Sequence, residues 1–137
     1  MTKEYTDIEQ SKKLTEILPL ESADMYYKYV LPNSDRIIHV PEIGNPVDSL
    51  KWYNEGYTFG GKREPITLSE YCIPCWSLAA LLNLCPTING KQPILTRGKL
   101  TRLWYCYYED EIDTQTYDNP VDAVFEMIQL LHEQKLL

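Results

Sequence analysis

Charge is missing from one long stretch of this sequence, because no Asp, Glu, Lys or Arg occurs between Glu70 and Lys91. The stretch is not expected to span a membrane, since Pro74, Asn83 and Pro86 interrupt it and no run reaches the roughly 18 apolar residues that a bilayer requires. Water is a poor environment for its Trp and Leu side chains. We therefore expect this stretch to form the centre of the core.

The sequence also has little of the chemistry that enzymes commonly use. Only two histidines occur, His39 and His132, and neither a His-Glu-x-x-His zinc motif nor a Gly-x-Ser-x-Gly nucleophile motif is present. The 13 basic residues are outnumbered by 20 acidic ones, which gives a net charge of -7. Because nucleic-acid affinity depends mainly on Lys and Arg contacts to phosphates, we expect no general nucleic-acid binding.

The first residues lack the apolar stretch of a signal peptide. We therefore expect a cytoplasmic protein, in a compartment where thiols stay reduced. A length of 137 residues suits a single compact domain over 1–137, which is large enough to bury a core without disulfides or a metal. We expect no cofactor.

Capping residues and prolines predict where the helices begin. Thr6 and Glu9 form a capping box, Pro74 suits the first position of a helix, and Asn119 precedes Pro120 in the same role. Apolar and aromatic runs between turn residues predict strands. The predicted helices cover 6–18, 74–84 and 120–135, and the predicted strands cover 25–30, 36–40, 92–95, 100–108 and 112–117.

These elements predict an α+β fold, with an antiparallel sheet of about four to six strands packed against N-terminal, central and C-terminal helices. Residues 41–65 are expected to hold only one short helical turn after Asn45 and one irregular strand near 52–59. Asn45-Pro-Val-Asp recurs at Asn119-Pro-Val-Asp, which we interpret as one helix start used twice. The predicted core consists of Trp76, Leu78, Leu81, Leu82, Trp104, Val124, Phe125, Ile128 and Leu131.

The pair Cys72-Ile-Pro-Cys75 is the one motif with candidate catalytic chemistry. A thiolate at a helix start has a lowered pKa, but no buried strand of the thioredoxin type precedes this pair. A zinc site would use Cys72, Cys75 and Cys85, with Cys106 as a further candidate, although structural zinc usually takes two close pairs of ligands. A hydrolase that pairs Cys75 with either histidine also stays open. The favoured interpretation is that the cysteines are small buried apolar residues.

Tyrosine dominates the aromatic residues, with eleven Tyr in a chain that is 12% aromatic. This favours half-buried sheet faces or a surface that binds a partner, because a tyrosine ring buries area while its hydroxyl stays hydrated. Met127 and Leu130 fall outside the main apolar face of the last predicted helix, so they contact another element or another chain. Together with Trp104 and Tyr105, they are the candidate partner-binding residues.

These features favour a small non-enzymatic protein-binding module, whose partner is another protein or a second copy of the chain. Two alternatives stay open. One is a thiol-redox or metal site on Cys72 and Cys75, and the other is an acidic inhibitor that occupies the surface of a nucleic-acid-binding protein.

Two stretches of the chain also resemble known proteins. Residues 71–82, which read Tyr-Cys-Ile-Pro-Cys-Trp-Ser-Leu-Ala-Ala-Leu-Leu, and residues 119–128 are similar to segments of small uncharacterised proteins of gut Bacteroidetes and their prophage-like elements. The resemblance covers roughly the C-terminal half and implies no activity, cofactor or catalytic residue. It implies a setting in which binding to a host or phage protein is favoured.

Overall fold

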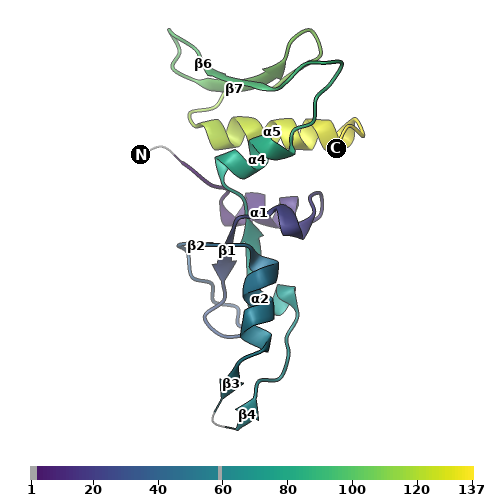
Figure 1. Cartoon of the computed structure of the whole chain (residues 1–137). Coiled ribbons are helices and arrows are strands. Elements are labelled where there is room, and N and C mark those ends of the chain that lie inside the picture. Colours follow the sequence, from purple (N-terminus) through teal and green to yellow (C-terminus); the bar gives the residue numbers. More distant parts are fainter. Residues whose placement is uncertain (1–2, 59) are drawn as a thin grey trace. The chain divides into compact units, whose positions relative to one another are not determined.

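The computed structural model describes residues 3–58 and 60–137 (Figure 1). The chain divides into two compact units, an N-terminal unit of residues 7–76 and a C-terminal unit in which residues 77–137 are joined by the segment that ends at Thr6. The described residues form five α-helices and three small antiparallel sheets, which confirms the predicted α+β class with smaller sheets than expected. The expectation of one domain over the whole chain stays a prediction.

Short helices and short strands alternate in the N-terminal unit. In chain order they are α1 (Ile8–Leu14), the 3-10 helix η1 (Leu20–Ser22), β1 (Met25–Lys28), β2 (Glu42–Ile43), α2 (Pro46–Asn54), β3 (Tyr57–Thr58), β4 (Gly61–Lys62), α3 (Leu68–Tyr71) and β5 (Cys72–Cys75). Strands β2, β1 and β5 form one antiparallel sheet in that order, and β3 pairs with β4. Helix α1 packs on β5, and α2 packs on η1 and α3.

Tyrosines and a tryptophan fill the interior of this unit. The rings of Tyr26 and Tyr71 lie 5.9 Å apart, and both side chains are buried. The Tyr26 hydroxyl donates to Glu42 Oε2 at 2.6 Å, which ties β1 to β2. The fully buried Trp76 donates its indole N–H to Ser22 Oγ at 3.0 Å. Each of these aromatic rings thus contributes burial, while the polar atoms of Tyr26 and Trp76 keep a partner.

The helix predicted over 74–84 begins too early. Residues Cys72–Cys75 form β5, and the central helix α4 (Leu78–Leu84) begins only after Ser77, whose Oγ accepts a hydrogen bond from Ala80 N at 3.1 Å. Pro74 fits either structure locally, because proline is tolerated at a helix start and on an edge strand. Antiparallel pairing of β5 with the distant β1 decides between the two.

The strand predicted over 36–40 is reduced to one isolated antiparallel bridge, in which Ile37 pairs with Tyr29 at the end of the strand predicted over 25–30. Val30 N donates to Arg36 O at 3.0 Å and Ile38 N donates to Lys28 O at 2.9 Å beside this bridge. The full-length neighbours of β1 are β2 and β5 instead. The segment that follows is more ordered than expected, because α2 continues well beyond the single helical turn predicted after Asn45.

The first helix has a capping box one residue later than predicted. Asp7, rather than Thr6, caps α1: its carboxylate accepts from Gln10 N at 2.8 Å, and Gln10 Oε1 accepts from Asp7 N at 3.1 Å. Thr6 is instead buried in the C-terminal unit. There the neighbouring Tyr5 forms an antiparallel bridge with Ser77.

The C-terminal unit combines two helices with a three-stranded sheet. After α4 come β6 (Ile94–Arg97), β7 (Trp104–Tyr108), β8 (Ile112–Asp113) and α5 (Pro120–Glu133). The sheet has the order β6-β7-β8 with antiparallel neighbours. Helix α5 lies along one face of this sheet and also packs on α4 (Figure 1). The predicted C-terminal helix is confirmed. Strand β6 lies two residues later than the strand predicted over 92–95, and β7 and β8 are shorter than the strands predicted over 100–108 and 112–117.

Burial agrees with most of the predicted core. The fully or nearly buried members are Trp76, Leu81, Val124, Phe125, Ile128 and Leu131. The half-buried members are Leu78, Leu82 and Trp104. None of the helices described combines the length and apolar character needed to cross a bilayer.

Candidate functional site

The two cysteines of the Cys72-Ile-Pro-Cys75 motif lie on a strand, which separates their side chains. Successive side chains of a strand point to opposite faces, so residues three apart project to opposite sides. In a helix the same spacing would place both on one face. The strand β5 therefore holds the two sulfur atoms on different faces of the sheet, and neither of them is in a disulfide. This arrangement gives no support to a dithiol redox pair.

Burial also makes these thiols poor nucleophiles. Cys72 is 2% exposed and Cys75 is 0% exposed. Desolvation raises the pKa of the Cys72 thiol to about 12, so almost none of it is thiolate at neutral pH. The lowered pKa expected for a cysteine at a helix start is absent at Cys72, because the helix does not begin there.

Cys85 and Cys106 are buried together in the C-terminal unit. Desolvation raises the pKa of Cys85 to about 11 and that of Cys106 to about 12. The Cys85 thiol donates to Leu81 O at 3.5 Å. Among residues 3–58 and 60–137, no three His, Cys, Asp or Glu side chains are grouped so that they could hold a metal ion. His39 and His132 are both exposed.

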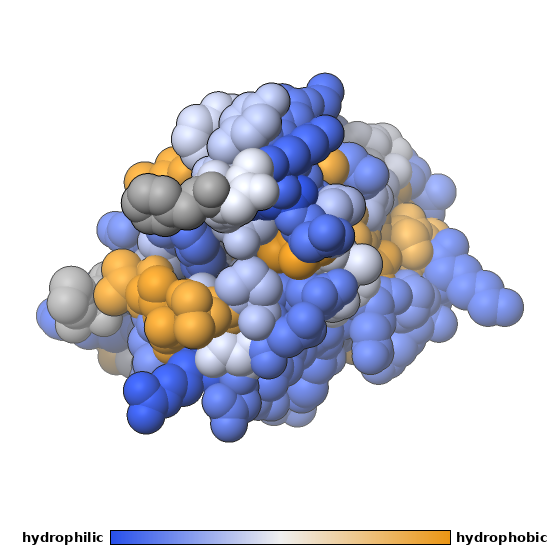
Figure 2. Space-filling view, turned by 90° about the horizontal axis from the view of Figure 1, so that it is seen from below, coloured by the Kyte–Doolittle hydropathy of each residue, from blue (hydrophilic) through white to orange (hydrophobic). Residues whose placement is uncertain are grey.

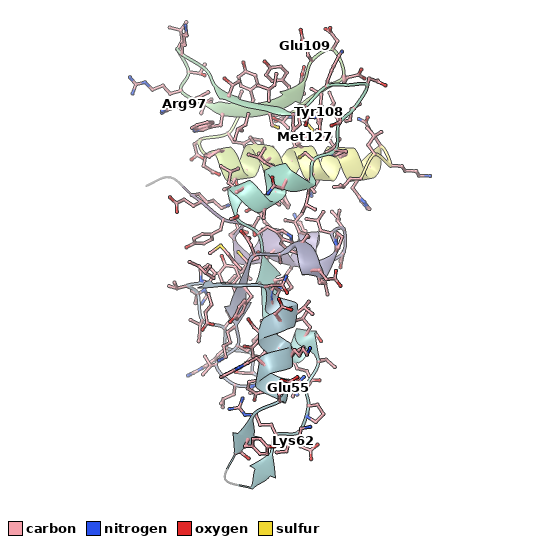
Figure 3. The ribbon with its side chains drawn as sticks, viewed as in Figure 1. Glu55, Lys62, Arg97, Tyr108, Glu109 and Met127 are labelled. Atoms are coloured by element: carbon pink, nitrogen blue, oxygen red, sulfur yellow. The ribbon has the colours of Figure 1, made fainter. Side chains whose placement is uncertain are left out.

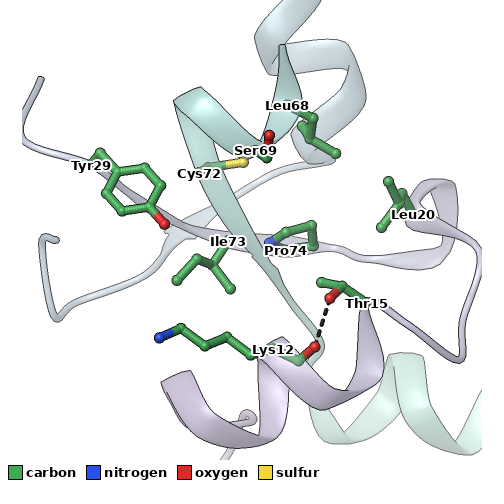
Figure 4. Close-up of a pocket in the computed structure, with 9 residues that line it drawn as sticks. All are labelled: Lys12, Thr15, Leu20, Tyr29, Leu68, Ser69, Cys72, Ile73 and Pro74. Atoms are coloured by element: carbon green, nitrogen blue, oxygen red, sulfur yellow. Dashed lines mark hydrogen bonds between the residues drawn. The ribbon is translucent and has the colours of Figure 1, made fainter. Parts of the chain in front are cut away.

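A shallow pocket of about 250 Å³ lies beside β5 in the N-terminal unit (Figure 4). Its lining is mostly apolar, and the one charged group is the Lys12 ammonium, which Figure 4 shows well apart from the Cys72 sulfur. The Thr15 hydroxyl is already used, because it donates to Lys12 O at 2.6 Å. The lining holds no carboxylate or imidazole that could act as a base toward Cys72. The pocket residues are Lys12, Thr15, Leu20, Tyr29, Leu68, Ser69, Cys72, Ile73 and Pro74.

The most distinctive surface is the face of the C-terminal sheet opposite α5. Side-chain alternation along β7 directs the buried Cys106 and Tyr108 toward α5 and places Tyr105 and Tyr107 on the other face. Figure 3 shows Tyr108 and Met127 in the layer between the sheet and the helix. Of the described elements of this unit, none packs in the same way on the opposite face.

We name this opposite side the tyrosine face and define it by Tyr105, Tyr107, Ile94 and Thr96. The rings of Tyr105 and Tyr107 are stacked, with centroids 5.7 Å apart and planes at 24°. In the strand register Ile94 lies opposite Tyr107 and Thr96 lies opposite Tyr105, so all four side chains share the face. Ile94 is 40% exposed.

Charges of opposite sign lie at the two ends of the tyrosine face. Figure 3 shows Arg97 at one end of the sheet and Glu109 at the other. The last residue of β6 and the turn that follows it carry the exposed cations, which are Arg97, Lys99 and Arg102. The turn between β7 and β8, with β8 itself, carries the exposed anions, which are Glu109, Asp110, Glu111 and Asp113.

Some of these charges already have partners within the chain. The Arg97 guanidinium lies 5.9 Å from the Trp104 ring centre, and its Nε donates to Arg102 O at 3.0 Å. At the other end, Lys91 Nζ donates to Glu109 O at 2.7 Å and lies 3.8 Å from the Glu111 carboxylate. Taken together, the anionic end keeps a surplus of negative charge and the cationic end a surplus of positive charge.

The four predicted partner-binding residues do not lie on one surface. Tyr105 lies on the tyrosine face, but Trp104 projects to the α5 side of β7. Leu130 is half-buried on α5. Met127 is 0% exposed, which corrects its assignment to a partner surface and leaves contact with another element as the explanation of its position. Sequence reasoning missed Tyr107, although alternation along the β-prone run would have grouped it with Tyr105.

The N-terminal unit also exposes apolar side chains. The largest exposed fractions belong to Ile43, at 88%, and Trp52, at 80%. Figure 2, seen from below, shows apolar side chains gathered in separate patches on a mostly hydrophilic surface. Ile43 lies on the edge strand β2 and Trp52 lies on helix α2, so these two exposed side chains come from different segments.

Comparison with protein-family models, with curated proteins and with solved structures found no match for this chain.

Proposed function

We propose that this chain is a non-enzymatic protein-binding module and that it binds its partner through the tyrosine face. The single observation that carries the proposal is the stacked pair Tyr105 and Tyr107, both half-buried, on the sheet face opposite the one that α5 covers. Tyrosine is enriched at protein interfaces, because its ring buries a large area at a small cost in side-chain entropy.

The rest of the site supports binding rather than catalysis. The cysteine thiols are buried, with raised pKa values at Cys72, Cys85 and Cys106. The pocket beside β5 lacks a base near Cys72. The exposed acids of the C-terminal sheet gather at one end of the tyrosine face, opposite a basic end. An inhibitor that imitates nucleic acid would need a continuous acidic face, so this distribution favours the binding module.

Site-specific photo-crosslinking tests the proposal. A benzophenone amino acid placed at Tyr107 should give adducts of discrete mass in cells that express the chain. The same group at Tyr57, which is 75% exposed in the N-terminal unit, serves as the matched control and should give fewer adducts. A Tyr105→Ser change in the Tyr107 probe should reduce its adducts several-fold. Equal labelling from both positions, or no adduct from either, would contradict the proposal.

A further inference from the structure

We infer that the occupant of the tyrosine face is a second copy of this chain, packed face to face by a two-fold axis. This inference rests on the proposed function and names its partner. It is carried by the charge distribution, because the cationic end, with Lys99 and Arg102, and the anionic end, with Glu109 and Asp113, lie at opposite ends of one sheet face. A surface with this pattern is complementary to itself.

The charges also select one of two symmetric arrangements. Two sheets that meet face to face are related by a two-fold axis lying in the plane between them. An axis parallel to β7 would place each cationic end over the cationic end of the partner. An axis perpendicular to β7 reverses the strand and places each cationic end over an anionic end. Like-charge contacts are unfavourable, so the perpendicular axis is the one that the pattern supports.

The perpendicular axis also brings the aromatic residues together. If it passes at the level of Cys106, which lies midway along β7, Tyr105 of one copy faces Tyr107 of the other. Packed sheets lie about 10 Å apart, a distance that rings from both faces fill by interdigitating. Asp113, which is paired with Tyr107 in the strand register, then lies on the shared face and toward the partner's cationic end.

The expected dimer is weak. Five residues of β7 span about 17 Å and three strands span about 14 Å, so the whole tyrosine face measures roughly 250 Å², against about 800 Å² per partner in a standard interface. The net charge of -7 on each copy also opposes association. Local charge pairing has to outweigh this repulsion, so we expect a dissociation constant on the order of 10–100 μM.

Charge reversal in two complementary variants tests the inference. Sedimentation equilibrium at chain concentrations up to about 500 μM should show a reversible dimer of the unaltered chain, since this range exceeds the expected dissociation constant. The variants K99E/R102E and E109K/D113K should each associate at least about tenfold more weakly, because each brings like charges together. An equimolar mixture of the two should recover association, because every reversed end then faces an end of opposite sign.

A second variant separates loss of association from loss of folding. Arg102 has a φ of 58°, in the left-handed region that glycine adopts without strain. Arg102→Gly therefore removes one interfacial charge without adding backbone strain at that turn. It should weaken the dimer a few-fold with little change in the urea midpoint. Tyr105→Ser with Tyr107→Ser should abolish the dimer.

The outcomes distinguish the two proposals. A chain that stays monomeric at about 500 μM, above the expected range, overturns the inference of a second copy. So does a mixture of reversed variants that fails to recover association. If the monomeric chain still crosslinks from Tyr107 to a different protein, the inference fails and the proposed binding function stands. If neither a dimer nor an adduct forms, both fail.

Discussion

The Lys3 ammonium lies 2.8 Å from the Asp122 carboxylate, although the two residues are 119 positions apart in the sequence. Asp122 lies in the first turn of α5, where a carboxylate also compensates the partial positive charge of the helix N-terminus. The pair thus ties the beginning of the described chain to the helix that covers the C-terminal sheet.

We predict that Lys3→Met lowers the free energy of unfolding by less than about 1 kcal/mol, because both side chains are partly exposed and a surface ion pair contributes little. The loss should be larger in 20 mM than in 500 mM salt, because salt screens the interaction between exposed charges. The Debye screening length is about 10 Å at 0.1 M salt and shortens as the salt concentration rises. Urea unfolding at the two salt concentrations measures it. Lys13→Met, on the exposed side of α1, is the control. A salt-independent loss would show that the charge is not responsible.

The four cysteines should resist alkylation in the folded protein. Every thiol is buried, so iodoacetamide at pH 8 should label fewer than one cysteine per chain in the time that labels all four in urea. Mass spectrometry counts the adducts. Rapid labelling of Cys72 or Cys75 in the folded chain would contradict the proposed binding function and revive the thiol-enzyme alternative.

Stability should fall at alkaline pH. In the unfolded chain a thiol ionises near pH 8.5, whereas in the folded chain burial raises the pKa of Cys72 and Cys106 to about 12 and of Cys85 to about 11. Below pH 8.5 the thiols are protonated in both states and contribute no pH dependence. Above it, the unfolded state loses protons that the folded state keeps, so stability is lost as pH rises toward the folded pKa values.

Each of the three thiols of Cys72, Cys85 and Cys106 should contribute a loss of about 1.4 kcal/mol per pH unit between roughly pH 9 and 10.5. Urea midpoints between pH 7 and 10.5 measure the slope. Cys106→Ala should be less stable at pH 7, because it leaves a small cavity, yet should lose stability less steeply with pH. A slope that Cys106→Ala leaves unchanged would show that this thiol does not titrate as described.

The two Asn-Pro helix starts should differ in their contribution to stability. Both side chains accept hydrogen bonds from the first turn of their helix, as the repeated sequence predicts. The Asn45 amide also donates to Glu21 O at 2.8 Å and to Ala23 O at 3.0 Å, which holds α2 against η1, whereas the Asn119 amide donates to carboxylates near it in the sequence, those of Asp118 at 3.0 Å and Asp122 at 2.7 Å. We expect Asn119→Ala to cost about 1 kcal/mol and Asn45→Ala about 2 kcal/mol.

Urea unfolding of both variants gives the comparison. The matched control is Asn83→Ala, an exposed position inside α4, which should be neutral or slightly stabilising because alanine has the higher helix propensity. An Asn119→Ala change more harmful than Asn45→Ala would mean that the hydrogen bonds from Asn45 to η1 contribute less than those from Asn119 to its neighbouring carboxylates.

Local signals in the sequence were sufficient for the last third of the fold. Asn119 and Pro120 mark the start of α5, and the β-prone run from Trp104 marks β7. Local signals were not sufficient in the middle of the chain, because Pro74 is compatible both with a helix start and with an edge strand. Only the pairing of β5 with β1 resolves this ambiguity, and local sequence does not encode that pairing.

The candidate site was predicted only in part, because its geometry also depends on pairing that local sequence does not encode. Tyr105 was recognised, but Met127 was grouped with it from a helical projection, which does not show that the sheet covers that side of α5. The cysteines were expected to be buried, and they are. The complementary ends of the tyrosine face could not be recognised from the sequence, because their relation depends on the register of β6, β7 and β8.

The N-terminal unit is a continuous run of chain inserted into a C-terminal unit made of two separated pieces. During synthesis every residue of the N-terminal unit therefore leaves the ribosome before residues 77–137 of the C-terminal unit have been made. The Glu4 carbonyl accepts a hydrogen bond from Leu78 N at 3.0 Å, so this hydrogen bond forms only after Leu78 has been synthesised. Nascent chains halted before α4 should thus hold a folded 7–76 and an unattached leading segment, which only the finished polypeptide can dock.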